Sequence, residues 1–187
     1  MFEGTMVALV TPFRNGSLDI GRLRALTAKM VDAGVDTIVP TGTTGESATL
    51  NHEEHLAVIR HVIEEAKGKA KVLAGTGSNA THEAIALTRA AKEAGADGAL
   101  LISPYYNKPT QEGLYQHFAL VAKEVSLPIV LYNIPGRTAV KIETETLARL
   151  SQIPNIVGVK DSTGSLETVM DSINACRAGF EVYSGED

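Results

Sequence analysis

The chain has 187 residues, of which 44% are hydrophobic and 21% charged, a composition typical of a globular protein and not of a disordered or collagen-like one. Its net charge is −5 and Lys and Arg form no cluster, which argues against nucleic acid as a partner. The N-terminus has no basic segment of a secretory signal, and no apolar run approaches the ~20 residues that span a bilayer. We therefore expect a cytoplasmic protein without membrane contact.

The only cysteine, Cys176, excludes an internal disulfide and fits a reducing compartment. Cys176 continues a helical apolar pattern formed by Val169, Met170 and Ile173. We therefore interpret it as a packing residue and not as a nucleophile.

Short apolar runs recur along the chain at intervals typical of βα units, about 30 residues. The runs are nearly continuous in apolar residues, as expected for parallel strands that are covered on both faces. They are predicted as strands at Met6–Val10, Thr37–Pro40, Lys71–Ala74, Gly98–Ile102, Ile129–Tyr132, Ile156–Val159 and Glu181–Tyr183.

Helix signals fill the stretches between these runs. Residues suited to N-caps stand at Asp19, Asn51, Thr81 and Thr110. Glycines suited to the left-handed conformation after a helix stand at Gly34, Gly68, Gly95 and Gly179.

This alternation leaves two α/β architectures, an open doubly wound sheet or a (β/α)8 TIM barrel. The even spacing and the absence of a dinucleotide glycine fingerprint favour the barrel. A barrel has eight strands and about 250 residues. We therefore expect residues 1–187 to be a single, incomplete barrel domain, the N-terminal portion of a longer chain that lacks the eighth strand and the C-terminal helices.

The most informative candidate residue is Lys160, which ends an apolar run at the rim where active sites of parallel α/β proteins lie. Poor hydration there would lower the pKa of its ammonium, and the neutral amine could form a Schiff base with a carbonyl. The alternative is a lysine that extends to solvent or pairs with Asp161. Tyr132 ends the preceding strand and is either a proton-transfer group or a half-buried aromatic residue.

Three further features of this rim have both a functional and a structural interpretation. The turn Gly42–Glu46 offers N–H groups and hydroxyls to a carboxylate, or is merely a glycine-rich turn. Arg137 is suited to bidentate carboxylate binding, or to a surface ion pair. His52 and His55 are three residues apart and not four as in zinc proteases, so we expect surface or interface residues and no metal site.

Three motifs together carry a family resemblance: Gly42-Thr43-Thr44-Gly45-Glu46, the run 132–138, and Gly158-Val159-Lys160-Asp161. With Gly4-Thr5 at one end and Ser184-Gly185 at the other, the chain resembles the dihydrodipicolinate synthase family of Schiff-base aldolases, within the N-acetylneuraminate lyase superfamily. The resemblance implies a TIM barrel without cofactor. It also implies condensation of pyruvate with L-aspartate 4-semialdehyde to 4-hydroxy-tetrahydrodipicolinate, the first committed step of lysine biosynthesis.

The same resemblance implies catalytic roles. Lys160 would form the imine with pyruvate, and Tyr132 would be the central proton donor and acceptor. A relay would link Tyr132 through Thr43 to Tyr106, which would come from a neighbouring subunit of a homotetramer, a dimer of dimers.

Substrate-binding roles are implied in the same way. Thr44 would bind the carboxylate of pyruvate, and Arg137 the carboxylate of the aldehyde. Gly185 would line the pocket.

The resemblance further implies allosteric inhibition by L-lysine at a subunit interface remote from the imine. The chemistry of the matching residues suits this ligand, because they offer a carboxylate for its ammonium and hydrogen-bond donors for its carboxylate. They are Ser47, Ala48, His52, His55, Asn79, Glu83 and Tyr105.

Two other functions compete with the synthase. A sister aldolase, of the N-acetylneuraminate lyase or 2-keto-3-deoxy sugar acid type, would share Lys160 and Tyr132 but bind a polyol aldehyde; Arg137 favours a short aldehyde with a carboxylate. A non-catalytic paralogue would have lost Lys160 or Tyr132, and both are present. The 187 residues by themselves could also be an inactive fragment.

Overall fold

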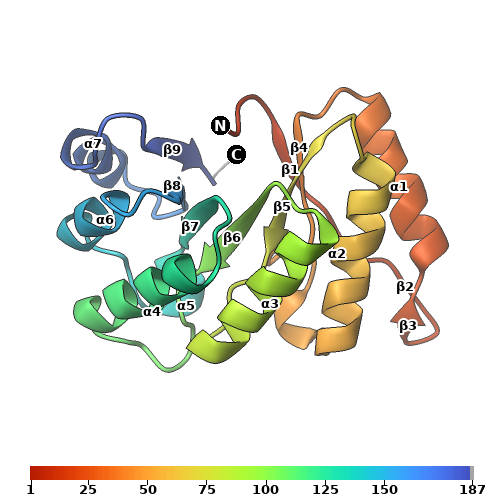
Figure 1. Ribbon diagram of the computed structural model, residues 1–187, viewed down its shortest axis with the longest axis horizontal. Coiled ribbons are helices and arrows are strands. Elements are labelled where there is room, and N and C mark those ends of the chain that lie inside the picture. Colours follow the sequence, from red (N-terminus) through yellow and green to blue (C-terminus); the bar gives the residue numbers. More distant parts are fainter. Residues whose placement is uncertain (186–187) are drawn as a thin grey trace. The chain divides into compact units, whose positions relative to one another are not determined.

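The computed structural model describes residues 1–185, along which strands and helices alternate (Figure 1). Seven strands occur in one sheet in the same order as in the chain, and the pairs β1–β4, β4–β5, β7–β8 and β8–β9 are parallel. This order is that of a β/α barrel, since a doubly wound sheet reverses its strand order. The predicted fold class and all seven strand positions are confirmed: β1 (Met6–Ala8), β4 (Thr37–Val39), β5 (Lys71–Gly75), β6 (Gly98–Ile102), β7 (Ile129–Asn133), β8 (Ile156–Asp161) and β9 (Glu181–Ser184).

The helices lie between these strands, and none within residues 1–185 combines the length and apolar character needed to cross a membrane. Asp19, Asn51 and Thr110 cap helices as predicted, each accepting a hydrogen bond from the N–H group three residues on. Thr81 is wrong as a predicted N-cap, because it is the first residue of its helix and its hydroxyl contacts His117 instead. The helices are α1 (Ile20–Asp32), the 3-10 helix η1 (Ser47–Thr49), α2 (His52–Ala66), α3 (Thr81–Ala94), α4 (Gln111–Glu124), α5 (Pro135–Thr138), α6 (Thr144–Ser151) and α7 (Leu166–Ala175).

A small antiparallel hairpin, β2 (Phe13–Arg14) and β3 (Ser17–Leu18), was not expected from the apolar runs. Asn15 and Gly16 join its strands with φ angles of 52° and 80°. A two-residue turn with both φ values positive favours an Asn-Gly pair, so the signal was present in the sequence.

The chain packs into two compact units, the first formed by Met1–Thr76 with Leu87–Ala99. In this unit α1 and α2 pack together and lie on one side of the strands β1, β4 and β5 (Figure 1). Its core is built from apolar residues of the helices, the strands and the loops beside them: Leu9, Leu23, Ile38, Leu50, Val58, Val62, Ala66 and Val72.

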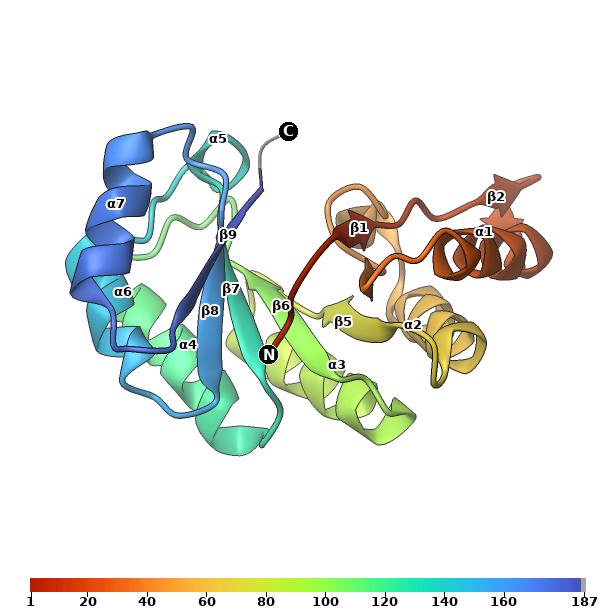
Figure 2. The same cartoon turned by 90° about the horizontal axis from the view of Figure 1, so that it is seen from above.

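The second unit is formed by Gly77–Ala86 and the chain from Leu100 on. Helices α4, α6 and α7 lie along one side of β7, β8 and β9, and α6 packs on both α4 and α7 (Figure 2). Every residue of β7 is buried, as the continuous apolar run predicts for a strand covered on both faces.

Helix α7 buries its small hydroxyl residues within residues 1–185. Its apolar residues face outward, with Leu166 82%, Met170 62% and Ile173 59% exposed, whereas Thr168 and Ser172 are buried. Cys176, just after α7, is half-buried, and burial raises the pKa of its thiol, in keeping with a packing residue and not a nucleophile. The small hydroxyl residues can face inward because Ser172 satisfies its own hydroxyl on the carbonyl of Thr168, 2.8 Å away.

Candidate functional site

Lys160 and Tyr132 lie side by side on neighbouring strands. They are direct partners in the parallel pairing of β8 with β7, one residue before each strand ends. Lys160 Nζ lies over the Tyr132 ring, 4.5 Å from its centroid, and Tyr132 is buried. The two residues chosen for Schiff-base and proton-transfer chemistry therefore share the carboxyl end of the sheet, where such chemistry takes place in this fold class.

Asp161 was the alternative partner for Lys160. Its Oδ1 instead accepts hydrogen bonds from the backbone N–H and the hydroxyl of Thr163, at 3.0 and 2.6 Å. The carboxylate is thus oriented by the turn that follows β8.

Gly185 lies against Lys160. Its N–H donates to the carbonyl of Asp161 at 2.7 Å, and a Cβ atom on Gly185 would lie 2.8 Å from Lys160 Cε. Only glycine fits here without displacing the lysine side chain. The same Cβ would lie 2.1 Å from the buried Ser162 Oγ, which has no hydrogen-bond partner within residues 1–185. Ser162 was not among the predicted site residues, although it stands two residues after Lys160.

Arg137 lies in the one-turn helix α5, in the loop that follows β7. Its side chain is exposed, and within the described residues it forms no ion pair or hydrogen bond. The surface ion pair that was its structural alternative is absent from this part of the chain.

The turn Gly42–Glu46, in the first unit, uses some of its N–H groups internally. Those of Gly45 and Glu46 bond to the carbonyls of Gly42 and Thr43 at 3.1 and 3.0 Å. The N–H groups and hydroxyls of Thr43 and Thr44 form no such bond within residues 1–185. Thr43 and Thr44 therefore keep the donors that a carboxylate would need.

Neighbouring threonines hold this turn in place. The Thr11 hydroxyl donates to the carbonyl of Gly45 at 2.6 Å, and that of Thr41 lies 2.9 Å from the carbonyl of Gly75. Thr41 itself adopts φ 52°, and a Cβ atom on Gly75 would lie 2.2 Å from its carbonyl oxygen. The turn is thus fixed by close backbone contacts that require glycine at position 75.

Residues predicted for the lysine site fall in both units. In the second unit Asn79 Nδ2 lies 3.4 Å from the carbonyl of Tyr105, and burial, with a smaller contribution from the charge of Glu83, raises the pKa of Tyr105. Ser78 donates to Glu83 at 2.7 Å, so Ser78 lies beside this group, although no sequence pattern indicates it. Asn79, Glu83 and Tyr105 are thus close to one another.

The remaining members, Ser47, Ala48, His52 and His55, lie in the first unit. His55 is buried, and its Nε2 lies 2.7 Å from the carbonyl of Gly75. Burial, opposed in part by this hydrogen bond, lowers the pKa of His55.

Tyr106 is 90% exposed and adopts φ 71°. A large aromatic side chain so exposed, on a backbone conformation that non-glycine residues rarely adopt, suggests a functional constraint on this position.

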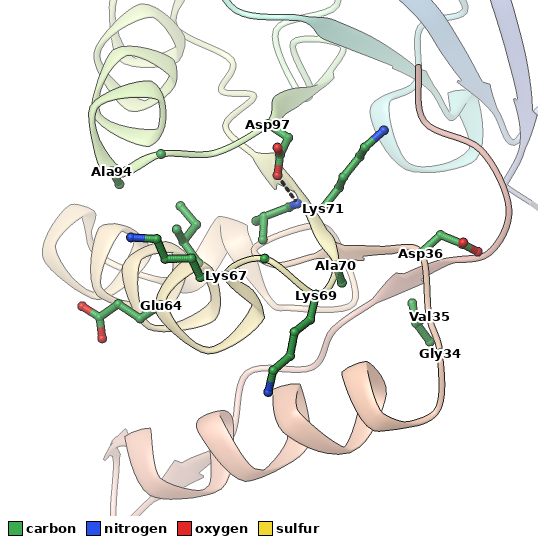
Figure 3. A pocket seen from close by; sticks show the side chains of 14 residues that line it. Gly34, Val35, Asp36, Glu64, Lys67, Lys69, Ala70, Lys71, Ala94 and Asp97 are labelled. Carbon is green, nitrogen blue, oxygen red and sulfur yellow. Dashed lines mark hydrogen bonds between the residues drawn. The ribbon is translucent and has the colours of Figure 1, made fainter.

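No group of three or more His, Cys, Asp or Glu side chains in the described part of the chain is arranged to hold a metal ion. A pocket of about 680 Å³ lies elsewhere in the first unit (Figure 3). It is lined by the loops that precede β4, β5 and β6, including Lys67 and Lys69, and by Lys71 at the start of β5. Active sites of this fold class lie at the opposite ends of the strands, so this pocket is not the candidate site.

The strand order, with a lysine and a tyrosine paired at the strand ends, defines a β/α-barrel protein with a candidate site at the carboxyl rim. A model of the Dihydrodipicolinate synthetase family matches residues 1–187, and the chain belongs to this family.

Two relatives show how close the similarity is. The 4-hydroxy-tetrahydrodipicolinate synthase of Nitratidesulfovibrio vulgaris is 57% identical over 187 residues, covering all of this chain and 64% of the relative. The crystal structure of dihydrodipicolinate synthase from Aquifex aeolicus matches with a TM-score of 0.97 at 51% identity, over 99% of this chain and 64% of that chain. The chain thus spans somewhat less than two thirds of the length of these relatives.

Two other solved structures contain small molecules. The dihydrodipicolinate synthase of Acinetobacter baumannii is complexed with pyruvate (TM-score 0.96, 49% identity), and that of Cyanidioschyzon merolae has lysine bound (TM-score 0.96, 42% identity). Each covers 99% of this chain, which in turn covers 64% of each.

Proposed function

We propose that this protein is a 4-hydroxy-tetrahydrodipicolinate synthase, which condenses pyruvate with L-aspartate 4-semialdehyde in the cytoplasm as the first committed step of lysine biosynthesis. The observation that carries the proposal is the pairing of Lys160 with Tyr132 at the ends of β8 and β7. The named relatives and the pyruvate complex of the Acinetobacter enzyme support the same activity.

The chemistry begins at Lys160. Its neutral amine attacks C2 of pyruvate, and loss of water gives an imine whose nitrogen accepts an electron pair when a methyl proton leaves. The resulting enamine carbon attacks the aldehyde carbon of the second substrate. The amino group of that substrate then displaces Lys160 from C2 as the ring closes, which returns the free enzyme.

Proton transfer in these steps is assigned to Tyr132, since its ring already contacts Lys160 Nζ. Thr43 and Tyr106 would connect Tyr132 to solvent. The exposure of Tyr106 supports a position at an interface, where a neighbouring subunit of a homotetramer would receive it.

Two carboxylates need recognition in this reaction. The unused N–H and hydroxyl groups of Thr44 are suited to that of pyruvate. The exposed guanidinium of Arg137 is suited to that of the aldehyde, because it can bind a carboxylate through two parallel hydrogen bonds. Gly185 completes the pocket by leaving room for the lysine side chain.

Feedback inhibition by L-lysine is part of the proposal. Asn79, Glu83 and Tyr105 together offer a carboxylate and hydrogen-bonding groups to an amino acid. The Cyanidioschyzon enzyme, which binds lysine, supports this site. Ser47, Ala48, His52 and His55 are its proposed members from the first unit.

The test is to trap the imine. Borohydride added with pyruvate to the natural-length protein should reduce one imine per subunit, and peptide mass spectrometry should find the adduct on Lys160. Lys160→Ala should abolish trapping, whereas Lys123→Ala, at the exposed end of α4, should trap like the wild type. An adduct on another side chain, or none in protein that is active, would refute the mechanism.

A further inference from the structure

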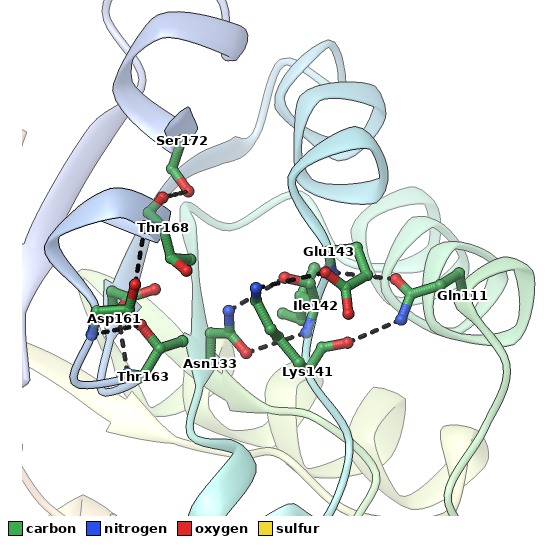
Figure 4. Close-up of polar contacts among 10 residues, drawn as sticks. Gln111, Asn133, Lys141, Ile142, Glu143, Asp161, Thr163, Thr168 and Ser172 are labelled. Atoms are coloured by element: carbon green, nitrogen blue, oxygen red, sulfur yellow. Dashed lines mark hydrogen bonds and ion pairs between the residues drawn. The ribbon is translucent and has the colours of Figure 1, made fainter. Parts of the chain in front are cut away.

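Two side-chain amides hold the same short stretch of backbone, residues 141–143 (Figure 4). Asn133 donates to the carbonyl of Ile142 at 3.2 Å and accepts from its N–H at 3.0 Å. Gln111 donates to the carbonyl of Lys141 at 2.8 Å and accepts from the N–H of Glu143 at 3.1 Å. Each amide thus pairs with backbone as a neighbouring strand would, one on either side of the stretch.

These contacts are needed because residues 139–143 belong to no helix or strand. Asn133 and Ile142 are each only 1% exposed, so the backbone groups of Ile142 have little access to water. Buried N–H and C=O groups that lack partners are costly, and the two amides supply partners that secondary structure does not.

The contact between Asn133 and Ile142 closes the loop that carries Arg137. Within the loop, the buried Thr138 hydroxyl lies 3.0 Å from the carbonyl of Ile134 and 2.8 Å from that of Val140. The backbone of the loop is therefore fixed at its base and at its turn. The Arg137 side chain remains exposed upon this fixed support.

We propose that Asn133 and Gln111 are positioning residues that set the location of the Arg137 guanidinium and thereby the selectivity for an aldehyde with a carboxylate. This inference rests on the proposed function, in which Arg137 binds that carboxylate. A bidentate ion pair depends on geometry, and misplacement of about 1 Å at a binding group can cost on the order of 10²-fold in rate.

The test uses Gln111, because Asn133 is buried and its variants could fail to fold. In the natural-length protein, Gln111→Ala should lower kcat/KM for L-aspartate 4-semialdehyde about tenfold at saturating pyruvate. The rate of borohydride trapping of pyruvate should stay within about twofold of the wild type. Gln111→Glu keeps the hydrogen-bond acceptor but loses the donor. Its kcat/KM for L-aspartate 4-semialdehyde should lie between those of the wild type and Gln111→Ala. Gln116→Ala removes an amide from the same helix whose one bonding partner within residues 1–185 is Glu112, and it should behave like the wild type.

A double-mutant cycle separates positioning from a general structural role. If Gln111 acts through Arg137, then Gln111→Ala should cause no further loss in an Arg137→Ala background. The proposal is overturned if Gln111→Ala leaves kcat/KM for the aldehyde unchanged, or if it slows trapping of pyruvate by the same factor as it lowers that kcat/KM. It is also overturned if Gln111→Ala lowers kcat/KM as much in the Arg137→Ala background as in the wild type. A wild type that traps no pyruvate would refute the proposed function itself, a result that no Gln111 variant can produce.

Discussion

His117 of α4 should make the stability of the protein depend on pH. The ring is buried, with Nδ1 2.9 Å from the Thr81 hydroxyl and its edge against Phe118. Its Nε2 has no hydrogen-bond partner within residues 1–185, so a proton added there would be a buried charge without an acceptor. Burial accordingly lowers the pKa of His117 from 6.5 to about 4.

The sign follows from comparing the two states. Between pH 6.5 and about 4 the unfolded chain takes up a proton on this histidine and the folded protein does not. The contribution to stability is therefore fully present above pH 6.5 and is lost as the pH falls toward 4. It amounts to about 2 kcal/mol between pH 7 and 5, and on the order of 3 kcal/mol by pH 4.

The assay is urea unfolding at pH 5, 6 and 7, on the wild type and on His117→Asn, whose amide can still reach Thr81. The variant should be less stable at pH 7 but should lose about 2 kcal/mol less on going to pH 5. His82→Gln, on an exposed position of α3, removes a histidine without touching the core and serves as the control. Equal pH slopes in the wild type and His117→Asn would refute the reasoning, as would an NMR titration of His117 with a midpoint near 6.5.

Three further outcomes are expected. Tyr132→Phe keeps the ring beneath Lys160 and removes only the hydroxyl, so kcat should fall by roughly 10²–10⁴; an unchanged kcat would exclude Tyr132 from proton transfer. Gly185→Ala forces a carbon against Lys160 Cε and should slow borohydride trapping at least about tenfold. The control Gly21→Ala, whose added carbon meets only ordinary contacts on α1, should trap at the wild-type rate. Equal trapping rates in the two variants would contradict the packing argument. In a titration of activity, millimolar L-lysine should inhibit the wild type strongly and Glu83→Ala much less. Equal inhibition of both proteins would remove Glu83 from the proposed lysine site.

The features predicted correctly from the sequence are those that local composition determines. Continuous apolar runs marked all seven strands, since strands covered on both faces carry apolar residues at every position. The N-cap at Asn51 was predicted correctly because a cap and the helix start that it serves lie within four residues; in the structure Glu54 completes a capping box with it. The candidate lysine and tyrosine were found because each ends such a run.

The features that were missed depend on tertiary contacts. The apolar pattern groups Met170 and Ile173 on one face of α7, and within residues 1–185 this face is exposed whereas Thr168 and Ser172 are buried. A helical pattern states which residues share a face, but the surrounding elements decide which face packs. In the same way, nothing local relates Gln111 to Lys141, because a side-chain amide that substitutes for a strand is recognisable only after folding.

The pairing of Tyr132 with Lys160 itself rests on such a non-local feature. Ile129 pairs with Ile156, but the next residue, Val130, pairs with Gly158, so β8 contains one extra residue, Val157, at this point. Without this β-bulge the register would place Tyr132 beside Val159, and the lysine would point to the opposite face from the tyrosine, because side chains alternate along a strand. The two candidate residues are therefore neighbours because of an irregularity early in the strand, before the candidate site is reached. Its position is not encoded in either residue, which is why the sequence could identify both members of the pair but not their register.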